Sequence, residues 1–239
     1  FMDECKKMRV TIKGPDVNES YADFGVNSEG NIRFGLAAIK GIGENVVNGI
    51  ISSRSEGGPF KSIYDFVERV PLGTVNRRVV ESLALAVAFD CFSDMVQRED
   101  FFEPNAKGET FAELLVRYGQ RYQQDKQMQS MSLFGDDSAA ASTAGRPPIV
   151  PAMRWIDAER LGRERELVGI YLSANPLDPY YIELNYAFTS LKTFSEQAPI
   201  DGAEIRMGGM VSEFLVKQSQ RGTQFGILKV EDYSGTAEF

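Results

Sequence analysis

The chain has 239 residues, of which 43% are hydrophobic and 25% are charged, and this composition is typical of one or two globular domains. It contains two cysteines and no histidine, so we expect neither a disulfide framework nor a zinc site, and we predict no metal or cofactor for the chain itself. No apolar run is long enough to span a membrane and no signal peptide is recognisable, so we expect a cytoplasmic protein without a membrane partner.

Residues 1–8 are predicted to be the end of a helix, which residues 14–16 break. Residues 16–19 are rich in turn-forming residues, and short extended pieces are expected around Phe24 and Ile32. The chain begins at Phe1 and stops at Phe239, inside a run of alternating apolar residues, so both ends look cut. We therefore expect the chain to be a fragment of a larger protein.

Residues 32–51 contain the most informative pattern in the chain. Apolar residues flank a central Gly41-Ile42-Gly43 at spacings of three and four, which predicts one apolar face on each of two short helices. Glycine accepts positive φ, so the two glycines can form a tight turn with Ile42 pointing back between the helices. The second helix is expected to run to about Ser53 and to stop at residues 57–59.

The start of this second helix is a candidate phosphate site. Its first amides have no intrahelical acceptor and point along the helix dipole, and the glycines would let a phosphate approach the backbone. The segment resembles the helix-hairpin-helix motif, which holds a DNA backbone without reading bases. The predicted DNA-binding residues here are Lys40, Gly41, Ile42, Gly43, Glu44 and Asn45. The alternative is a plain helical corner whose glycines only make the turn.

A second helix pair is predicted from residue 62 to residue 86. Ser62 and Asp65 resemble an N-terminal capping pair, and Asn76 is a good N-cap for a helix that starts at Arg77. This pair is a degenerate copy of the first, and Asn76, Arg77 and Arg78 would make a second phosphate contact. The alternative for the two arginines is a solvated first turn.

The negative charge of the chain is uneven. The net charge is −8, yet seven basic and six acidic residues lie between Asn31 and Cys91. Because this segment is nearly neutral, contact with DNA must depend on where its cations lie rather than on bulk charge.

Several short motifs occur in an order that resembles the α subunit of DNA polymerase III, the bacterial replicative polymerase. They lie at residues 15–20, 34–43, 58–60, 65–69 and 88–90. The resemblance places residues 31–95 just after the fingers of that polymerase, where the family carries tandem helix-hairpin-helix units. The family usually has a glycine where this chain has Val87, which puts the backbone turn there in doubt.

Residues 96–152 are predicted to be a connector. Apolar residues at Phe111, Leu114, Leu115, Tyr118 and Tyr122 are spaced for an amphipathic helix. The acidic residues near its start, which include Glu99, Asp100 and Glu103, are expected on a solvated surface, as are Asp136 and Asp137. Residues 136–151 are rich in Ala, Ser, Gly and Pro and are expected to be disordered or extended.

Residues 129–134 resemble the peptide by which bacterial replication proteins bind the sliding clamp. The predicted anchors are Gln129, Met131, Leu133 and Phe134. The commonest form of this peptide has five residues and this one has six, so its register is open. The alternative is the end of a helix that packs on the core.

The C-terminal third begins with a helix predicted at residues 153–172, with Asp157 as its N-cap, and a short helix that opens at Asp178 and runs through Tyr186. Residues 166–178 again resemble the polymerase, just before its oligonucleotide-binding (OB) domain, although Ala174 and Asn175 replace the usual Gly-His.

Residues 205–216, 223–230 and 236–239 are strand-like and look like the first three strands of a five-stranded OB fold, which would be cut short. The candidates for contact with single-stranded DNA are Phe214, Lys217, Arg221 and Phe225, with Tyr233 as a further aromatic. The alternative is that these aromatics are core residues.

These patterns predict an α+β protein with a tandem helix-hairpin-helix domain, connector helices and a truncated OB barrel. The predicted division is residues 1–30 as the end of the fingers and a linker, 31–95 as the tandem hairpins, 96–152 as the connector with the clamp peptide, 153–200 as a helical segment, and 201–239 as the first OB strands.

The resemblance implies a parent DNA-directed DNA polymerase that uses magnesium and deoxynucleotides, with catalytic carboxylates in a palm domain upstream of this chain. It implies double-stranded DNA, the sliding clamp, single-stranded DNA and other replisome subunits as partners. We expect the chain itself to be non-catalytic, without polymerase, nuclease or ligase activity. The alternatives are an accessory region of a DNA repair enzyme, a bypass polymerase paralogue, and an interaction scaffold without DNA contact.

Overall fold

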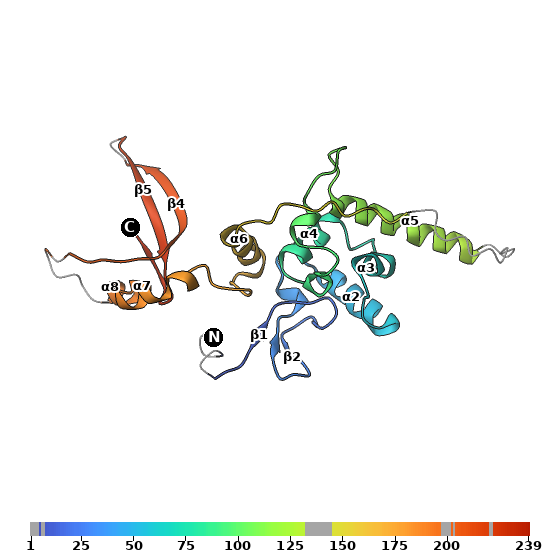
Figure 1. Ribbon diagram of the computed structural model, residues 1–239, viewed down its shortest axis with the longest axis horizontal. Helices are drawn as coiled ribbons and strands as arrows, with labels where there is room; N and C mark the ends of the chain where they lie inside the picture. Colours follow the sequence, from blue (N-terminus) through green and yellow to red (C-terminus); the bar gives the residue numbers. More distant parts are fainter. Residues whose placement is uncertain (1–4, 6–7, 132–144, 197–201, 203, 220–221) are drawn as a thin grey trace. The chain divides into compact units, whose positions relative to one another are not determined.

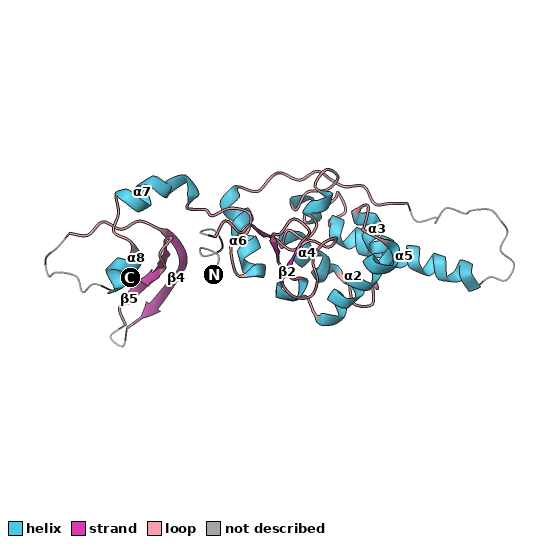
Figure 2. Ribbon diagram, turned by 90° about the horizontal axis from the view of Figure 1, so that it is seen from below, coloured by secondary structure: helices cyan, strands magenta, loops and turns pink. Residues whose placement is uncertain are grey.

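A computed structural model describes the chain except residues 1–4, 6–7, 132–144, 197–201, 203 and 220–221, and it describes no side chains for residues 129–131. The chain forms two compact units, Phe1–Ser173 and Ala174–Phe239. Both units combine helices with a small sheet, so the predicted α+β class is confirmed (Figures 1 and 2). Among the described residues the strands form no closed barrel.

The first unit begins with a small sheet of two-residue strands in the order β1-β3-β2. β1 (Ile12–Lys13) runs parallel to β3 (Ile32–Arg33), and β2 (Gly25–Val26) runs antiparallel to β3. The helical part follows as η1 (Leu36–Ala38), α2 (Glu44–Gly57), α3 (Ile63–Arg69), α4 (Arg77–Leu85), η2 (Asp90–Phe92), η3 (Glu99–Phe101), α5 (Phe111–Met131) and α6 (Asp157–Val168).

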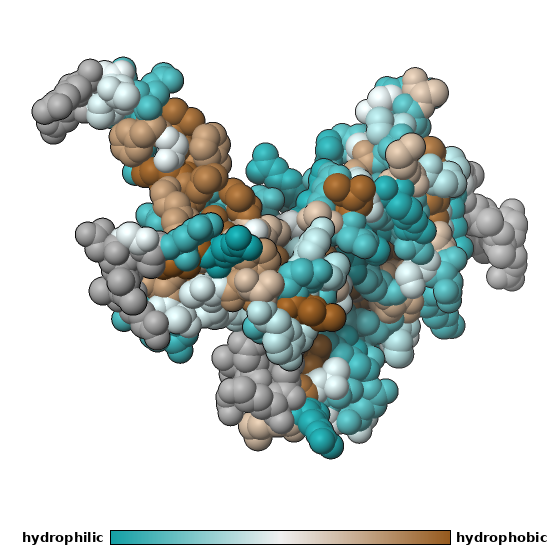
Figure 3. Space-filling model, turned by 60° about the vertical axis from the view of Figure 1, so that its left-hand side comes forward, coloured by the Kyte–Doolittle hydropathy of each residue, from teal (hydrophilic) through white to brown (hydrophobic). Residues whose placement is uncertain are grey.

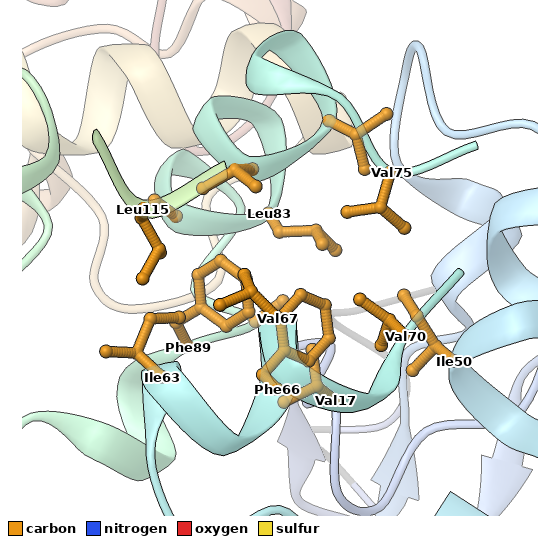
Figure 4. Packing of buried hydrophobic residues seen from close by; sticks show 14 of the residues in the cluster. Val17, Ile50, Ile63, Phe66, Val67, Val70, Val75, Leu83, Phe89 and Leu115 are labelled. Carbon is orange, nitrogen blue, oxygen red and sulfur yellow. The ribbon is translucent and has the colours of Figure 1, made fainter. Parts of the chain in front are cut away.

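The core of this unit lies between α2, α3, α4 and α5. Side chains from these helices point toward one another in Figure 4, where Phe66 of α3 and Phe89 lie at the centre. The rings of Phe66 and Phe89 meet edge to face, with their centroids 5.0 Å apart. Phe66 is fully buried and Phe89 is 3% exposed, so this contact joins α3 to the turn that follows α4.

The first helix pair differs from the prediction. The segment before the turn is only the three-residue 3₁₀ helix η1, since the backbone is already extended at Ile39. The second helix, α2, ends at Gly57, four residues later than expected, and Gly58 leaves the helical region with a φ of 74°.

The second helix pair forms as predicted. The side chain of Ser62 accepts a hydrogen bond from the Asp65 amide at 3.1 Å, and that of Asn76 accepts one from the Val79 amide at 3.2 Å. Both predicted N-caps are therefore confirmed, and they place the starts of α3 and α4.

Val87 takes a left-handed backbone conformation that favours glycine. Its φ is 65°, and the Ala88 amide donates to the Leu83 carbonyl at 2.9 Å, the bond that closes a Schellman turn after a helix. Glycine usually fills this position because β-branched residues are strained at positive φ. Val87 therefore makes a turn in which glycine is the usual residue.

Glu99 and Asp100 are buried, so the prediction that they lie on a solvated connector is wrong. Glu99 is 2% exposed and pairs with Arg154 at 3.1 Å and with Arg160 at 3.5 Å. Asp100 is 7% exposed and accepts hydrogen bonds from the amides of Gln97 and Ala152. Both carboxylates meet partners that lie up to 61 positions later in the chain, and local composition does not reveal such partners.

The segment after residue 144 is extended, but it is held to the core. The Tyr64 hydroxyl donates to the Pro147 carbonyl at 2.7 Å, and the Arg146 guanidinium lies over the Tyr64 ring and pairs with Glu68 at 3.2 Å. Residues 136–144 of the predicted flexible stretch lie outside the described residues.

The connector helix is confirmed as α5, which packs on α3 through its first turns (Figure 1). Phe111, Leu115 and Tyr118 are buried as predicted, whereas Leu114 and Tyr122 are only half-buried. The two helices approach each other closely at Gly119, since a Cβ added there would lie 2.8 Å from the Val67 carbonyl oxygen.

α6 is shorter than the predicted helix. It starts at Asp157, with Ile156 rather than Asp157 as N-cap, and ends at Val168 because Gly169 turns left-handed with a φ of 85°. Its Glu164 is fully buried and accepts hydrogen bonds from the Leu172 and Ser173 amides. Arg98 pairs with Glu164 at 3.1 Å and with the more exposed Asp90 at 2.5 Å, so a partly buried ion-pair network ties α6 to the turn after α4.

The second unit contains η4 (Asp178–Tyr180), α7 (Tyr181–Tyr186), α8 (Leu191–Glu196) and a meander of β4 (Met210–Gln218), β5 (Gln224–Glu231) and β6 (Thr236–Glu238). The three predicted strands are therefore present as an antiparallel sheet. α8 lies against β6, where the rings of Phe194 and Phe239 stack 5.8 Å apart. Apolar side chains remain exposed over β4 and β5, as the brown surface at the upper left of Figure 3 shows.

We predict opposite effects for one substitution at two helical glycines. Gly119→Ala should lower the free energy of unfolding by about 1–3 kcal/mol, because its methyl group would meet the Val67 carbonyl. Gly162→Ala in α6 should raise it by up to about 1 kcal/mol, because no atom lies within 4 Å of the added Cβ and alanine favours a helix. Urea unfolding measures both, and equal effects would contradict the close approach of α5 and α3.

We also predict that Arg98→Ala destabilises the first unit by about 3–5 kcal/mol, because it leaves the buried Glu164 without its cation. Arg117→Ala is the matched control, since Arg117 pairs with Glu109 at the surface and such pairs contribute less than about 1 kcal/mol. The midpoints of urea unfolding compare the two variants. A loss for Arg98→Ala as small as that for Arg117→Ala would mean that the buried pair contributes no more than a surface pair.

Candidate nucleic-acid interface

The hairpin turn between η1 and α2 exposes backbone and buries its one apolar side chain. Gly41 has a φ of 85°, and the Ile42 amide donates to the Ile39 carbonyl at 3.1 Å. Ile42 is 8% exposed and belongs to the core cluster, so it points inward as predicted, while Gly41 and Gly43 on either side of it face solvent.

Three consecutive backbone amides are exposed at the start of α2. Gly43 is the N-cap and has no side chain to cap the helix, and its carbonyl accepts the Val46 and Val47 amides. Within the described residues, the amides of Gly43, Glu44 and Asn45 have no protein acceptor. All three residues are exposed, and no atom lies within 4 Å of a Cβ added to Gly43. The turn therefore presents hydrogen-bond donors on an open surface at the positive end of a helix dipole.

The charges next to these amides have opposite signs. Lys40 is exposed, and in the part of the chain that the structure describes its ammonium group makes no hydrogen bond or ion pair. Glu44 offers a free amide, but its exposed carboxylate would repel an anion. The Lys40 amide donates to the Leu167 carbonyl at 2.9 Å, so the end of α6 holds the turn in place.

The start of α4 is a second group of free donors. Asn76 caps the Val79 amide, which leaves the amides of Arg77 and Arg78 without an acceptor among the described residues. The helix is nine residues long and carries no acidic residue in its first turn. Its N-terminus is therefore electropositive.

The two arginines of this turn have different surroundings. Arg77 donates from Nε to Glu81 at 2.7 Å and also pairs with Glu113 of α5. These contacts raise the pKa of Arg77, and the hydrogen bond to Glu81 is the main cause. Arg78 is exposed and has no ion pair to any residue that the structure describes. Arg78 is thus the free cation of the pair, a distinction that the sequence prediction did not make.

Arg78 also lies on the side of α4 that faces the first hairpin. A Cβ added to Gly41 would lie 3.9 Å from the Ser82 hydroxyl oxygen, which places Ser82 next to the turn. Residues four apart lie on one face of a helix, so Arg78 is one turn from this contact. The structure thereby brings the Gly43–Asn45 amides, Lys40 and Arg78 to one region of the first unit.

The predicted single-stranded DNA contacts in the second unit lie on opposite faces of the sheet. Lys217 pairs directly with Phe225 across β4 and β5, so they share a face, whereas Phe214 pairs with Leu228 on the other face. Phe214 is 60% exposed and Phe225 is 46% exposed, so neither is a core residue. Tyr233 is half-buried and donates to Asp178 at 2.9 Å, and Arg221 lies outside the described residues.

The clamp-peptide prediction falls largely outside the described residues. The backbone of Gln129–Met131 lies in the last turn of α5, but the side chains of Gln129 and Met131 are not described. Leu133 and Phe134 lie in the segment that the structure does not describe, so the motif stays a prediction.

Two statements about metals and membranes hold for the part of the chain that the structure describes. The described residues contain no group of three or more His, Cys, Asp or Glu side chains that could hold a metal ion. None of their helices combines the length and the hydrophobicity needed to cross a membrane.

Comparison with known proteins identifies two similarities. Residues 9–100 match the family model of the helix-hairpin-helix motif. The whole chain is 33% identical to DNA polymerase III subunit alpha of Vibrio cholerae and 32% identical to that of Caulobacter vibrioides, and each match covers 20% of the relative. It is 28% identical to the same subunit of Escherichia coli K12, again over 100% of this chain and 20% of the relative. The chain thus spans about a fifth of the length of the curated relatives that it matches, and the resemblance drawn from its motifs is confirmed.

Proposed function

Because this chain is related over its whole length to one segment of bacterial DNA polymerase III alpha subunits, we propose that it holds product duplex DNA during processive replication. The observation that carries the proposal is the row of three free amides at Gly43–Asn45, which lies within the residues that match the helix-hairpin-helix family. Backbone amides bind phosphate oxygens and carry no base information, so the binding is independent of sequence.

Charge placement supports weak rather than tight binding. Lys40 and Arg78 are the exposed cations without ion pairs beside the two helix starts, when only the described residues are counted. The chain as a whole is acidic, with a net charge of −8. A few phosphate contacts on an acidic protein give an affinity that falls steeply with salt.

The parent activity that we propose is DNA-directed DNA polymerisation with magnesium and deoxynucleotides, in the cytoplasm. We assign this chemistry to the part of the parent protein outside this chain, because the chain corresponds to only about a fifth of the length of its relatives. The names of the relatives favour this replicative role over a repair enzyme with similar hairpins.

We further propose contact with the sliding clamp through Gln129, Met131, Leu133 and Phe134, beside other replisome subunits. Binding to the clamp would strengthen weak duplex binding, because a chain that is already bound at one site has a high effective concentration at the other. For the second unit, we propose an OB-type role in which the face that carries Phe225 and Lys217 receives single-stranded DNA.

We predict that Gly43→Val weakens duplex binding about tenfold at low salt, a loss of roughly 1.4 kcal/mol, because the side chain would keep a phosphate away from the three amides. Gly43 has a φ of −83° and a ψ of 159°, which valine adopts without strain, so the fold should survive. Fluorescence anisotropy with a labelled duplex over a salt series measures the change.

Gly25→Val is the matched control for this substitution, since Gly25 also has open space around its added Cβ but lies in β2. Unchanged affinity in a folded Gly43→Val variant, or an equal loss in Gly25→Val, would rule out the hairpin as the grip.

We predict that the double substitution Leu133→Ala and Phe134→Ala removes most of the binding to a bacterial sliding clamp. Two buried apolar anchors together contribute on the order of 3–6 kcal/mol. Biolayer interferometry with immobilised clamp tests the full chain, with Ser132→Ala as a control within the same peptide. The motif is refuted if the double variant binds as tightly as the parent chain.

A further inference from the structure

Arg77 stands at the start of α4, where a cation would strengthen a phosphate contact, yet two carboxylates hold it. Glu81, one turn later on α4, accepts a hydrogen bond from Nε of Arg77 at 2.7 Å. Glu113 of α5 pairs with Nη1 of Arg77. The Arg77 side chain is 47% exposed and those of Glu81 and Glu113 are 21% and 30% exposed. The three groups therefore meet at the surface, where solvent and a phosphate can compete for the arginine.

Hydrogen bonds to Thr110 hold the Glu113 side chain in this position. Its Oε2 accepts the Thr110 amide at 2.9 Å, while its own amide donates to the Thr110 hydroxyl at 3.4 Å. This reciprocal pair is a capping box at the start of α5. One carboxylate oxygen thus caps α5 and the other faces Arg77, so the cap keeps the negative charge beside the start of α4.

We propose that Glu81 and Glu113 form an electrostatic latch that withholds Arg77 from DNA and so limits the affinity of this module for duplex. This inference rests on the proposed duplex binding. For Arg77 to reach a phosphate, it must leave two carboxylates, and these carboxylates then lie near the phosphate and repel it. The neighbouring Arg78 has no ion pair within the described residues and carries the contact instead.

The latch explains why only Arg78, and not Arg77, is available to DNA at the start of α4. A module that must move along product DNA as synthesis proceeds is favoured by contacts that are individually weak. Each added phosphate contact also makes binding steeper in salt, so withholding one cation flattens the salt dependence.

The test is Glu113→Gln, which removes the charge but keeps the cap, because glutamine also serves in a capping box. We expect duplex affinity at low salt to rise about three- to tenfold, with the slope of log K against log salt steeper by about 0.9 for one more phosphate contact. Glu109→Gln is the matched control. It also removes one negative charge near the start of α5, but Glu109 pairs with Arg117 and not with Arg77. Thermal unfolding of each variant checks that the fold is kept.

A double-substitution cycle assigns the gain to Arg77. Arg77→Ala alone should weaken binding, because it leaves the carboxylates of Glu81 and Glu113 without their cation beside the start of α4. In combination with Glu113→Gln it should remove most of the gain. Arg78→Ala should weaken both backgrounds severalfold. The latch is overturned if Glu109→Gln raises affinity as much as Glu113→Gln, or if the gain persists without Arg77. Failure of the parent chain and of every variant to bind duplex at the lowest salt would instead overturn the proposed function.

Discussion

The burial of Ile42 is the constraint on which the candidate interface depends. This side chain enters the core between η1 and α2, and the residues on either side must then turn their backbone outward. A left-handed φ at Gly41 makes the reversal, and Gly43 starts α2 without a capping side chain. The free amides at the start of α2 are thus a consequence of hydrophobic packing, since the same contact that stabilises the hairpin fixes the direction of its donors.

The two hairpins are held in one frame by the elements around them. α5 packs on α3 with Gly119 against the Val67 carbonyl, and α6 accepts the Lys40 amide at Leu167. Arg98 pairs both with the buried Glu164 of α6 and with Asp90 of η2, and so ties α6 to the turn after α4. α6 lies outside the residues that match the helix-hairpin-helix family, so part of the support for the hairpin comes from sequence beyond the motif.

Electrostatics at this surface is local rather than global. The chain is acidic, and its arginines are largely engaged, either in buried networks such as that of Arg98 or in surface pairs such as that of Arg77. At the starts of α2 and α4, exposed backbone amides lie beside the cations Lys40 and Arg78. Neither cation has an ion pair within the described part of the chain. An anion is attracted there despite the net charge, because interactions beyond about 10 Å are screened by salt.

The sheet of the second unit illustrates a different limit. Its strands follow the alternation of the sequence, and their pairing places Phe225 and Phe214 on opposite faces. A single-stranded nucleic acid that follows one face cannot stack on both rings, so only one of the two aromatics can belong to a binding face that includes Lys217. Strand existence is a property of local sequence, whereas the choice of face follows from register.

The sequence by itself determined the elements whose signals are local: the Gly41–Gly43 turn, the caps at Ser62 and Asn76, the three strands and the order of motifs that links the chain to its relatives. Only the tertiary structure decided which polar groups are free. Glu99 and Asp100 look like solvated residues until Arg154 and the Ala152 amide arrive from 52 or more positions away, and Arg77 looks like Arg78 until α5 brings Glu113 against it. Capping and turn formation involve neighbours in the chain, but the state of a charge depends on whatever folding places within a few ångströms of it, and that partner has no fixed distance in sequence.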